Sequence, residues 1–117
     1  MTMLKLLAAI IMVESGGDPQ AYNASEKAAG ILQIRPIMVE EVNRILELRG
    51  STLRFTLADR WCPDESVLMF NVYANHLARV NGPMTTEEVA RCWNGGPKGA
   101  SKKSTEKYWI KVKQRLQ

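Results

Sequence analysis

Apolar residues recur at three- and four-residue spacings in five segments of this chain, which is the period of an amphipathic helix. The first predicted helix starts after Thr2, whose hydroxyl can cap it, and continues to about Ser15. Its apolar face consists of Leu4, Leu7, Ala8 and Ile11. Glu14 follows Ile11 by three residues and is therefore expected on this face or close to it.

Two further patterns predict helices in the middle of the chain. Pro36 suits the first position of a helix that ends near Arg49. Its apolar stripe consists of Met38, Val42, Ile45 and Leu46. The next helix begins near Pro63 and Asp64 and continues to Val80. Its core-facing residues are Val67, Leu68, Phe70, Tyr73, Ala74 and Leu77.

The C-terminal part predicts two more helices. Thr85 and Glu88 form a capping box for a helix that reaches Asn94 and stops at the Gly-Gly-Pro of residues 95–97. Ser104 or Thr105 is expected to cap the last helix. That helix carries Tyr108, Trp109, Val112 and Leu116.

The segment between the first two helices has a different composition. Asn, Ser and Gly give residues 16–29 the character of a loop, and residues 30–34 read as a short extended or turn segment. We therefore predict a mainly α fold without internal repeats. The 117 residues suffice for a single domain over 1–117 with an ordinary globular composition, and neither a cofactor nor a metal site is expected.

The two cysteines and the N-terminus give weaker signals. Cys62 and Cys92 lack neighbours at metal-ligand spacing, so two free thiols are favoured, although a disulfide between them stays open. Residues 5–13 resemble a secretory signal, but no small-residue cleavage site follows them. No run reaches the roughly 18 apolar residues of a spanning helix, and we expect no membrane insertion.

Positive charge is concentrated at the C-terminus. The formal net charge is +4, while residues 98–117 alone contain seven Lys and Arg against one Glu. Such a patch is typical of proteins that bind a polyanion, either nucleic acid or an anionic wall polymer. An ordinary solvated helix face is the alternative.

Four motifs together carry a family resemblance. They are ESGGDP at residues 14–19, GILQI at 30–34, WNGGP at 93–97, and Thr105 followed three residues later by Tyr108. Their order and spacing resemble the soluble lytic transglycosylases, relatives of goose-type lysozymes in the lysozyme-like superfamily. The resemblance extends over nearly the whole chain. It implies a small lysozyme-like helical fold with a substrate cleft, and cleavage of the β-1,4 bond between MurNAc and GlcNAc in peptidoglycan.

Glu14 is the predicted catalytic residue. A carboxylate in the last turn of a helix opposes the helix dipole and loses hydration near an apolar face, and both effects should raise its pKa. Breaking a glycosidic bond requires a carboxylic acid that is still protonated near neutral pH. The resemblance implies that Glu14 acts as general acid and then as general base. A merely solvated Glu is the alternative reading of the residue alone.

The loops near Glu14 bear on the type of reaction. Most glycosidases pair the acid with a second carboxylate. The transglycosylases that this chain resembles lack one, and the 6-hydroxyl of the sugar attacks C1 to give a 1,6-anhydro product. Goose-type lysozymes commonly have Asp before and after the Gly-x-x-Gln segment, whereas residues 23–29 and 35–36 contain no Asp here. Transglycosylation is therefore favoured over hydrolysis, with Glu26 as the local candidate for a second carboxylate.

The resemblance also implies substrate-binding residues. Gln33 would line the sugar-binding cleft, or else form a hydrogen bond to the backbone. Asn94 would contact the substrate or orient Glu14, or else cap its helix. Tyr108 would reach the catalytic Glu, or else be a core aromatic. Asn23 and Ser25 lie where the family has a substrate-contacting serine.

Trp93 replaces a tyrosine of the family, and we expect it to stack on sugar or to pack. A non-catalytic wall-binding module and a nucleic-acid-binding domain are the rival functions; the intact motif residues disfavour the first, and the lack of any helix-turn-helix pattern disfavours the second. We expect a monomer that acts on the bacterial cell wall, with peptidoglycan glycan strands and no nucleic acid as partners. A phage endolysin and a domain of a larger secreted or conjugation-associated protein are both compatible with the chain.

Overall fold

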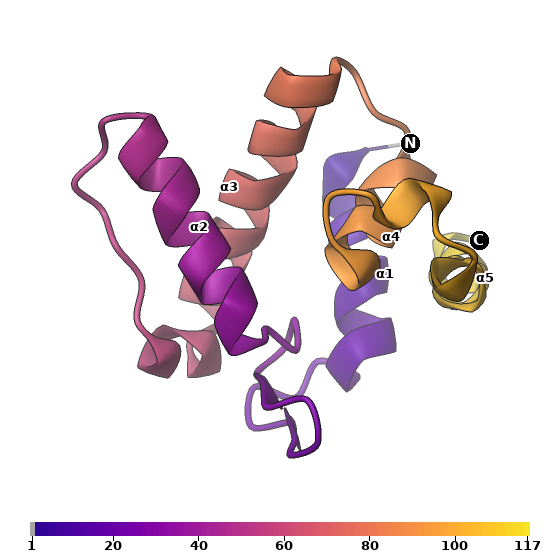
Figure 1. The fold of residues 1–117 in the computed structure, drawn as a ribbon. Coiled ribbons are helices and arrows are strands. Elements are labelled where there is room, and N and C mark those ends of the chain that lie inside the picture. Colours follow the sequence, from indigo (N-terminus) through magenta and orange to yellow (C-terminus); the bar gives the residue numbers. More distant parts are fainter. Residues whose placement is uncertain (1) are drawn as a thin grey trace. The chain divides into compact units, whose positions relative to one another are not determined.

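The computed structural model describes residues 2–117 (Figure 1). These residues divide into two units. Unit 1 combines the N-terminal residues as far as Val13 with residues Leu77–Gln117, and unit 2 is Glu14–His76. The single domain expected over 1–117 stays a prediction. In chain order the elements are α1 (Met3–Ser15), β1 (Tyr22–Asn23), β2 (Ala28–Ala29), α2 (Pro36–Leu48), η1 (Leu57–Trp61), α3 (Pro63–Asn81), α4 (Thr86–Gly95), η2 (Gly99–Ser101), η3 (Lys103–Thr105) and α5 (Glu106–Leu116). The predicted mainly α class is confirmed.

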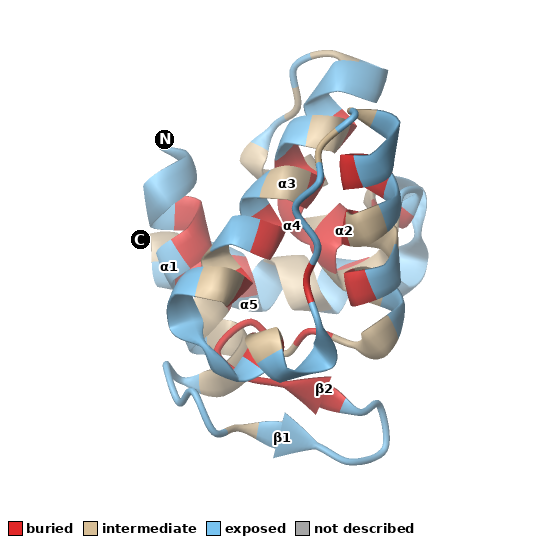
Figure 2. Ribbon diagram, turned by 90° about the vertical axis from the view of Figure 1, so that its left-hand side faces the viewer, coloured by how far each residue is buried: buried red, intermediate tan, exposed pale blue. Residues whose placement is uncertain are grey.

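A small β-hairpin interrupts the segment that we expected to be a loop. β1 and β2 pair antiparallel, with Tyr22 opposite Ala29, and Ala29 also forms an isolated bridge with Ile34. Strand β2 is buried whereas β1 is exposed (Figure 2). The loop prediction is wrong at these four residues because two-residue strands are too short to show an alternating pattern.

The face of α1 that is buried differs from the predicted one. Leu4 is 76% exposed, and the buried residues of the helix are Leu6, Leu7, Ala9 and Ile10. The apolar run of residues 6–13 permits either face, so periodicity alone could not choose between them. Glu14 follows Ile10 by four residues, and it therefore stays on the apolar side of the helix after this correction.

Helices α2 and α3 begin where the sequence predicts, and each buries a slightly different set of side chains. Pro36 occupies the first turn of α2, and Val39 is buried there whereas Met38 is half-buried. In α3 the prediction is wrong for Leu68, which is 46% exposed, while the neighbouring Met69 is fully buried. The remaining buried residues agree with the predicted stripes: Val42, Ile45 and Leu46 in α2, and Phe70, Tyr73, Ala74 and Leu77 in α3.

The caps of α4 and α5 differ from each other. Both bonds of the predicted capping box are present: the Thr85 N–H donates to Glu88 Oε1 at 2.9 Å and the Glu88 N–H donates to Thr85 Oγ1 at 3.1 Å. Thr105 directly precedes α5, but no side chain caps that helix. The Thr105 hydroxyl instead donates to the Gly99 carbonyl at 2.7 Å. Thr105 therefore occupies the predicted N-cap position, but its hydroxyl holds η2 and forms no capping bond to α5.

The structure also bears on the cysteines, on membrane-spanning helices and on metal sites. Cys62, which is exposed, and Cys92, which is buried, are not joined by a disulfide bond. Within residues 2–117 no helix has the length and hydropathy needed to cross a membrane. In the same range no three His, Cys, Asp or Glu side chains gather in a way that could hold a metal ion.

Candidate active site

The C-terminal end of α1, which carries Glu14, is tied to the GILQI segment by the next residue. Ser15 Oγ donates a hydrogen bond to the Ile31 carbonyl at 2.8 Å and accepts one from the Gly17 N–H at 3.1 Å. Glu14 itself is half-buried. The serine after the glutamate thus fixes the end of the helix against the segment that carries Gln33.

The turn after Glu14 contains a second carboxylate, Asp18, with a structural contact. Gly16 and Gly17 adopt φ values of 65° and 87°, which end the helix. Asp18 Oδ1 then accepts a hydrogen bond from the Gln20 N–H at 2.9 Å, an Asx-turn contact that shapes the loop.

Gln33 is held in an unusual backbone conformation by its own side chain. Its φ is 49°, in the left-handed region that non-glycine residues rarely occupy. Its Nε2 donates to the carbonyls of Ala21 and Gly30, both at 3.0 Å. The backbone hydrogen bond that was one of its two sequence interpretations is therefore present. Its amide oxygen accepts no hydrogen bond from residues 2–117, so that atom can still accept one from a ligand.

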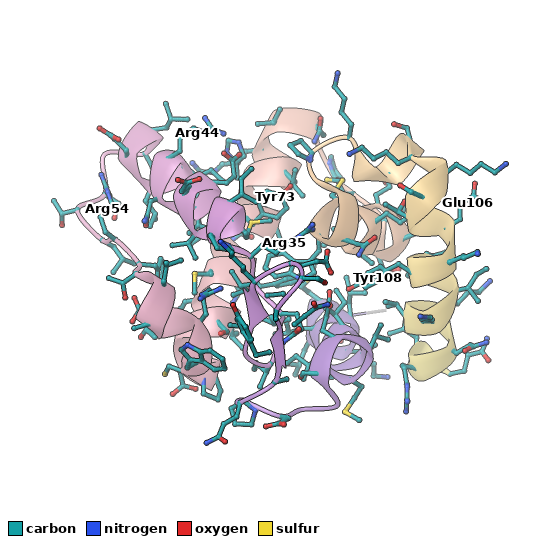
Figure 3. The ribbon with its side chains drawn as sticks, turned by 60° about the horizontal axis from the view of Figure 1, so that its bottom comes forward. Arg35, Arg44, Arg54, Tyr73, Glu106 and Tyr108 are labelled. Atoms are coloured by element: carbon teal, nitrogen blue, oxygen red, sulfur yellow. The ribbon has the colours of Figure 1, made fainter. Side chains whose placement is uncertain are left out.

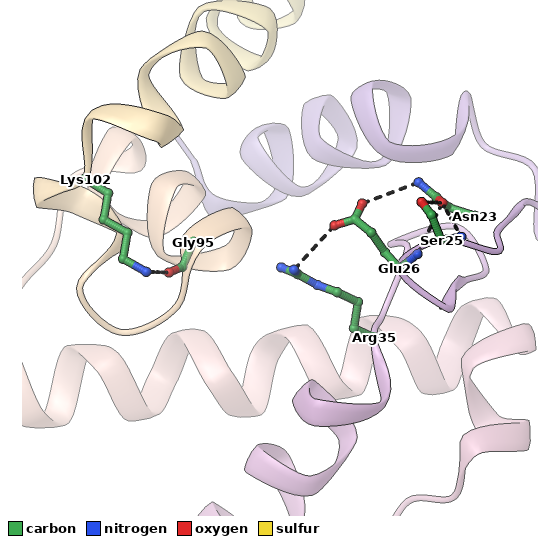
Figure 4. A network of polar contacts seen from close by, with 6 residues as sticks. All are labelled: Asn23, Ser25, Glu26, Arg35, Gly95 and Lys102. Atoms are coloured by element: carbon green, nitrogen blue, oxygen red, sulfur yellow. Dashed lines mark hydrogen bonds and ion pairs between the residues drawn. The ribbon is translucent and has the colours of Figure 1, made fainter.

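Polar side chains close the hairpin loop between β1 and β2. Asn23 Oδ1 accepts hydrogen bonds from the Ser25 N–H at 3.1 Å and the Ser25 hydroxyl at 2.8 Å (Figure 4). Arg35 Nη1 donates to one oxygen of the Glu26 carboxylate and Asn23 Nδ2 donates to the other, both at 3.4 Å. The side chain of Glu26 is 53% exposed. Asn23 thus organises the loop, while Ser25 and Glu26 stand at its surface.

Arg60 is a positioning residue that the sequence analysis did not identify. It is only 7% exposed, and Nη1 donates to the carbonyls of Lys27 at 2.6 Å and Ile34 at 3.0 Å, while Nε donates to the Leu57 carbonyl at 2.9 Å. Its own carbonyl oxygen faces Gly30, where a Cβ would overlap it. A lone arginine in an irregular segment gives no periodic signal, and no pattern in the sequence could have revealed this role.

In unit 1 the WNGGP motif spans the end of α4. Trp93 is 5% exposed, which agrees with the packing interpretation of this residue. Asn94 lies inside the last turn, and the capping position belongs to Gly96, with φ of 90° and an N–H that donates to the Cys92 carbonyl at 2.9 Å. Asn94 is therefore not the helix cap that one interpretation proposed.

Arg91, the second arginine that the sequence analysis missed, joins α4 to the start of α5. Nε donates to Thr105 Oγ1 at 2.8 Å, Nη2 donates to the Lys102 carbonyl at 2.7 Å, and Nη1 pairs with Glu87 at 2.8 Å. Lys102 Nζ donates in turn to the Gly95 carbonyl at 2.7 Å (Figure 4).

Tyr108 follows Thr105 by three residues and is half-buried on the first turn of α5 (Figure 3). The Arg91 network therefore supports the elements that carry Asn94 and Tyr108. In residues 2–117 this network and the Arg60 bonds are separate, one in each unit.

Comparison with known proteins gives the family. Residues 1–115 match the family model described as Transglycosylase SLT domain. This chain belongs to that family. It is 29% identical over 110 residues to a protein named Lysozyme from Magallana gigas, covering 92% of this chain and 76% of the relative. A chain of the crystal structure of Aeromonas hydrophila PliI in complex with Meretrix lusoria lysozyme superposes with a TM-score of 0.76 at 24% identity, covering 94% of this chain and 87% of that one.

These similarities confirm the resemblance and the lysozyme-like fold. At the level of the family, the SLT domain supports cleavage of the glycan strands of peptidoglycan. Within the SLT domain the structure places Glu14, Gln33, Asn23 and Ser25 in unit 2. The two other candidate residues, Asn94 and Tyr108, belong to unit 1.

Proposed function

We propose that this protein is a lytic transglycosylase that cleaves the MurNAc–GlcNAc β-1,4 bond with Glu14 as its one catalytic carboxylate. The single observation that carries the proposal is the bond from Ser15 Oγ to the Ile31 carbonyl, because it fixes the Glu14 turn to the Gln33 segment. In this reaction Glu14 donates a proton to the glycosidic oxygen as the bond to C1 breaks. It then takes the proton of the sugar's 6-hydroxyl as that oxygen bonds to C1 and closes the 1,6-anhydro ring.

The contacts of the neighbouring carboxylates support a mechanism with one acid. An inverting hydrolase needs a second carboxylate about 6.5–9.5 Å from the acid carboxyl, a separation that leaves room for the attacking water. Asp18 holds the Gln20 N–H in its turn, and both oxygens of Glu26 are engaged by Arg35 and Asn23. The 6-hydroxyl needs no such base, since it is tethered to the ring and gains the advantage of an intramolecular reaction.

The remaining candidate residues take substrate-binding roles. The free amide oxygen of Gln33 accepts a hydrogen bond from a sugar hydroxyl or amide, and the exposed Ser25 and Asn23 present further polar groups at the hairpin loop. Asn94 on α4 and Tyr108 on α5 are the further candidate substrate-binding residues. The substrate is the glycan strand of peptidoglycan, so the protein acts at the bacterial cell wall.

Hydrolysis of the same bond is the second candidate function. The 29% identity to a protein named Lysozyme favours it, and Glu26 is more than half exposed at the hairpin loop. A water held by Glu26 would then attack C1 in place of the 6-hydroxyl.

Muropeptide mass spectrometry after digestion in water labelled with heavy oxygen separates the two functions. Transglycosylation gives ends that are lighter by one water and carry no label, whereas hydrolysis gives labelled reducing ends. Glu14→Gln should abolish both products and keep native circular dichroism, since the amide keeps the shape and loses the proton. Glu47→Gln, on the exposed side of α2, is the matched control and should keep full activity. Labelled ends that disappear in Glu26→Gln would replace the proposal with a lysozyme.

A further inference from the structure

Unit 1 carries a groove that none of the motif residues lines. Its volume is about 390 Å³, which lies within the range of small-ligand sites, roughly 300–1,000 Å³. The residues that line it come from α1 and α5: Lys5, Ala8, Ala9, Met12, Arg115 and Leu116.

The lining of the groove combines small apolar side chains with two cations. Four of its six residues are apolar, and Ala8 and Met12 are exposed within it. Lys5 and Arg115 are both exposed, and neither forms an ion pair with any of residues 2–117. No acidic side chain lines the groove.

The charge of the whole unit strengthens the preference of this groove for anions. Unit 1 contains ten Lys and Arg against three Glu, a net charge of +7. A surface with such an excess of one sign raises the local concentration of oppositely charged ligands. A ligand for this groove should therefore carry at least one negative group beside small apolar groups.

We propose that the groove between Lys5 and Arg115 binds the short acidic peptide that peptidoglycan carries on its glycan strands. The choice of ligand rests on the proposed function. Such a stem peptide combines alanine methyl groups, which fit the Ala8 and Met12 surface, with carboxylates that Lys5 and Arg115 can neutralise. A polyphosphate would leave the apolar lining without a partner.

The test is a binding titration with the synthetic peptide N-acetyl-L-alanyl-γ-D-glutamyl-L-lysyl-D-alanine, monitored by NMR. The methyl resonances of Ala8, Ala9 and Met12 should shift. Lys5→Met combined with Arg115→Met should weaken binding about tenfold, since the variant loses both charges that face the carboxylates of the peptide. Lys107→Met combined with Lys113→Met removes the same charge outside the groove and should leave the affinity nearly unchanged.

Two further ligands complete the titration. The same peptide with both carboxylates amidated should bind at least several-fold more weakly. Equal binding of the amidated peptide, shifts confined to other residues, or tighter binding of inorganic polyphosphate in the groove would each overturn the proposal.

Cleavage of glycan strands stripped of their peptides keeps this proposal apart from the proposed function. The Lys5 and Arg115 double variant should cleave stripped strands at the wild-type rate and peptide-bearing strands more slowly. Cleavage of stripped strands without peptide binding would refute the role proposed for the groove and support the proposed function. Peptide binding without any cleavage would refute the proposed function and support the role of the groove.

Discussion

In each unit an arginine donates hydrogen bonds near the candidate residues, and the backbone carbonyl of that arginine packs against a glycine. In unit 2, Arg60 donates to backbone carbonyls of the hairpin and the GILQI segment, and its own carbonyl packs against Gly30. In unit 1, Arg91 donates to the Lys102 carbonyl and to Thr105. Its own carbonyl packs against Gly99, where a Cβ would overlap it.

The two arginines differ in how their charge is compensated. Arg60 has no ion pair with any of residues 2–117, and its guanidinium donates to three backbone carbonyls. Arg91 pairs with Glu87, and Thr105 and Lys102 add their own bonds to the same junction. The segment around Gln33 is therefore held by an arginine without an ion pair, together with the Ser15 hydroxyl and the Gln33 side chain. The junction of α4 and α5 is held by an arginine that also forms an ion pair.

The largest effect that we expect comes from Gly30→Ala. Gly30 has φ of 83°, and an added Cβ would overlap the Arg60 carbonyl, so the GILQI segment must shift or the chain must unfold. We expect a loss of about 4 kcal/mol of stability together with most of the activity.

Gly17→Ala is the matched control for that variant. Its φ of 87° imposes a similar backbone cost, but no atom lies within 4 Å of the added Cβ. It should lose only about 1–2 kcal/mol, measured by thermal unfolding. Equal losses in the two variants would show that φ alone, and not the contact with Arg60, requires glycine at position 30.

The sequence predicted the regular parts of both units and missed the parts that support the site. The helix starts could be predicted because their signals are local: Pro36 for α2 and the capping box of Thr85 and Glu88 for α4. The order of the motifs was sufficient to predict the family. Arg60 acts through the carbonyls of Ile34 and Lys27, which are 26 and 33 residues away, and Arg91 acts through the Lys102 carbonyl, 11 residues away. Neither a periodic pattern nor a spacing rule registers such bonds.

The second prediction compares the two arginines directly. Arg60→Met should cost about 3 kcal/mol, because three carbonyls lose their donor in a buried place. Arg91→Met should cost about 2 kcal/mol or less, since Thr105 keeps its bonds to the Gly99 and Lys102 carbonyls.

Arg54→Met, at an exposed position in unit 2, is the control for both changes and should stay within about 0.5 kcal/mol of wild type in urea unfolding. A larger loss for Arg91→Met than for Arg60→Met would contradict the expectation that the more deeply buried arginine, which holds three carbonyls, contributes more to stability.

The third prediction concerns the charge difference, since unit 2 has nine acidic residues against six Lys and Arg and so a net charge of −3. Wall lysis should fall as ionic strength rises, because the basic surface of unit 1 attracts an anionic wall through screenable charge. Lys107→Glu with Lys111→Glu on α5 should reduce lysis several-fold at low salt. Lys102 is unsuitable for this test because its ammonium holds the Gly95 carbonyl.

Charge reversal in unit 2 is the control. Arg54→Glu changes the net charge as much as Lys111→Glu does, and it should reduce lysis less. If both single variants lyse walls at the wild-type rate at every salt concentration, the basic C-terminal segment is an ordinary solvated face.

The smallest effect that we expect is the pH dependence of stability that comes from two carboxylates, Glu88 in unit 1 and Glu41 in unit 2. Hydrogen bonds from the Thr85 backbone and side chain hold the pKa of Glu88 below its ordinary value of 4.5, and the Arg44 side chain likewise lowers the pKa of Glu41. A carboxyl whose pKa is lower in the folded state stabilises the fold above its unfolded pKa. That contribution is lost as the pH falls through the folded pKa.

Glu88→Gln and Glu41→Gln should therefore lower Tm slightly near pH 7, and the difference from wild type should shrink as the pH falls from 4.5 through the folded pKa. Thr85→Ala removes the hydroxyl that accepts the Glu88 backbone N–H and should cost about 1 kcal/mol across this pH range. Thermal unfolding from pH 3 to 7 measures all three variants. A Tm difference for Glu88→Gln that persists unchanged at pH 3 would mean that packing of the side chain, and not the charged capping box, stabilises the start of α4.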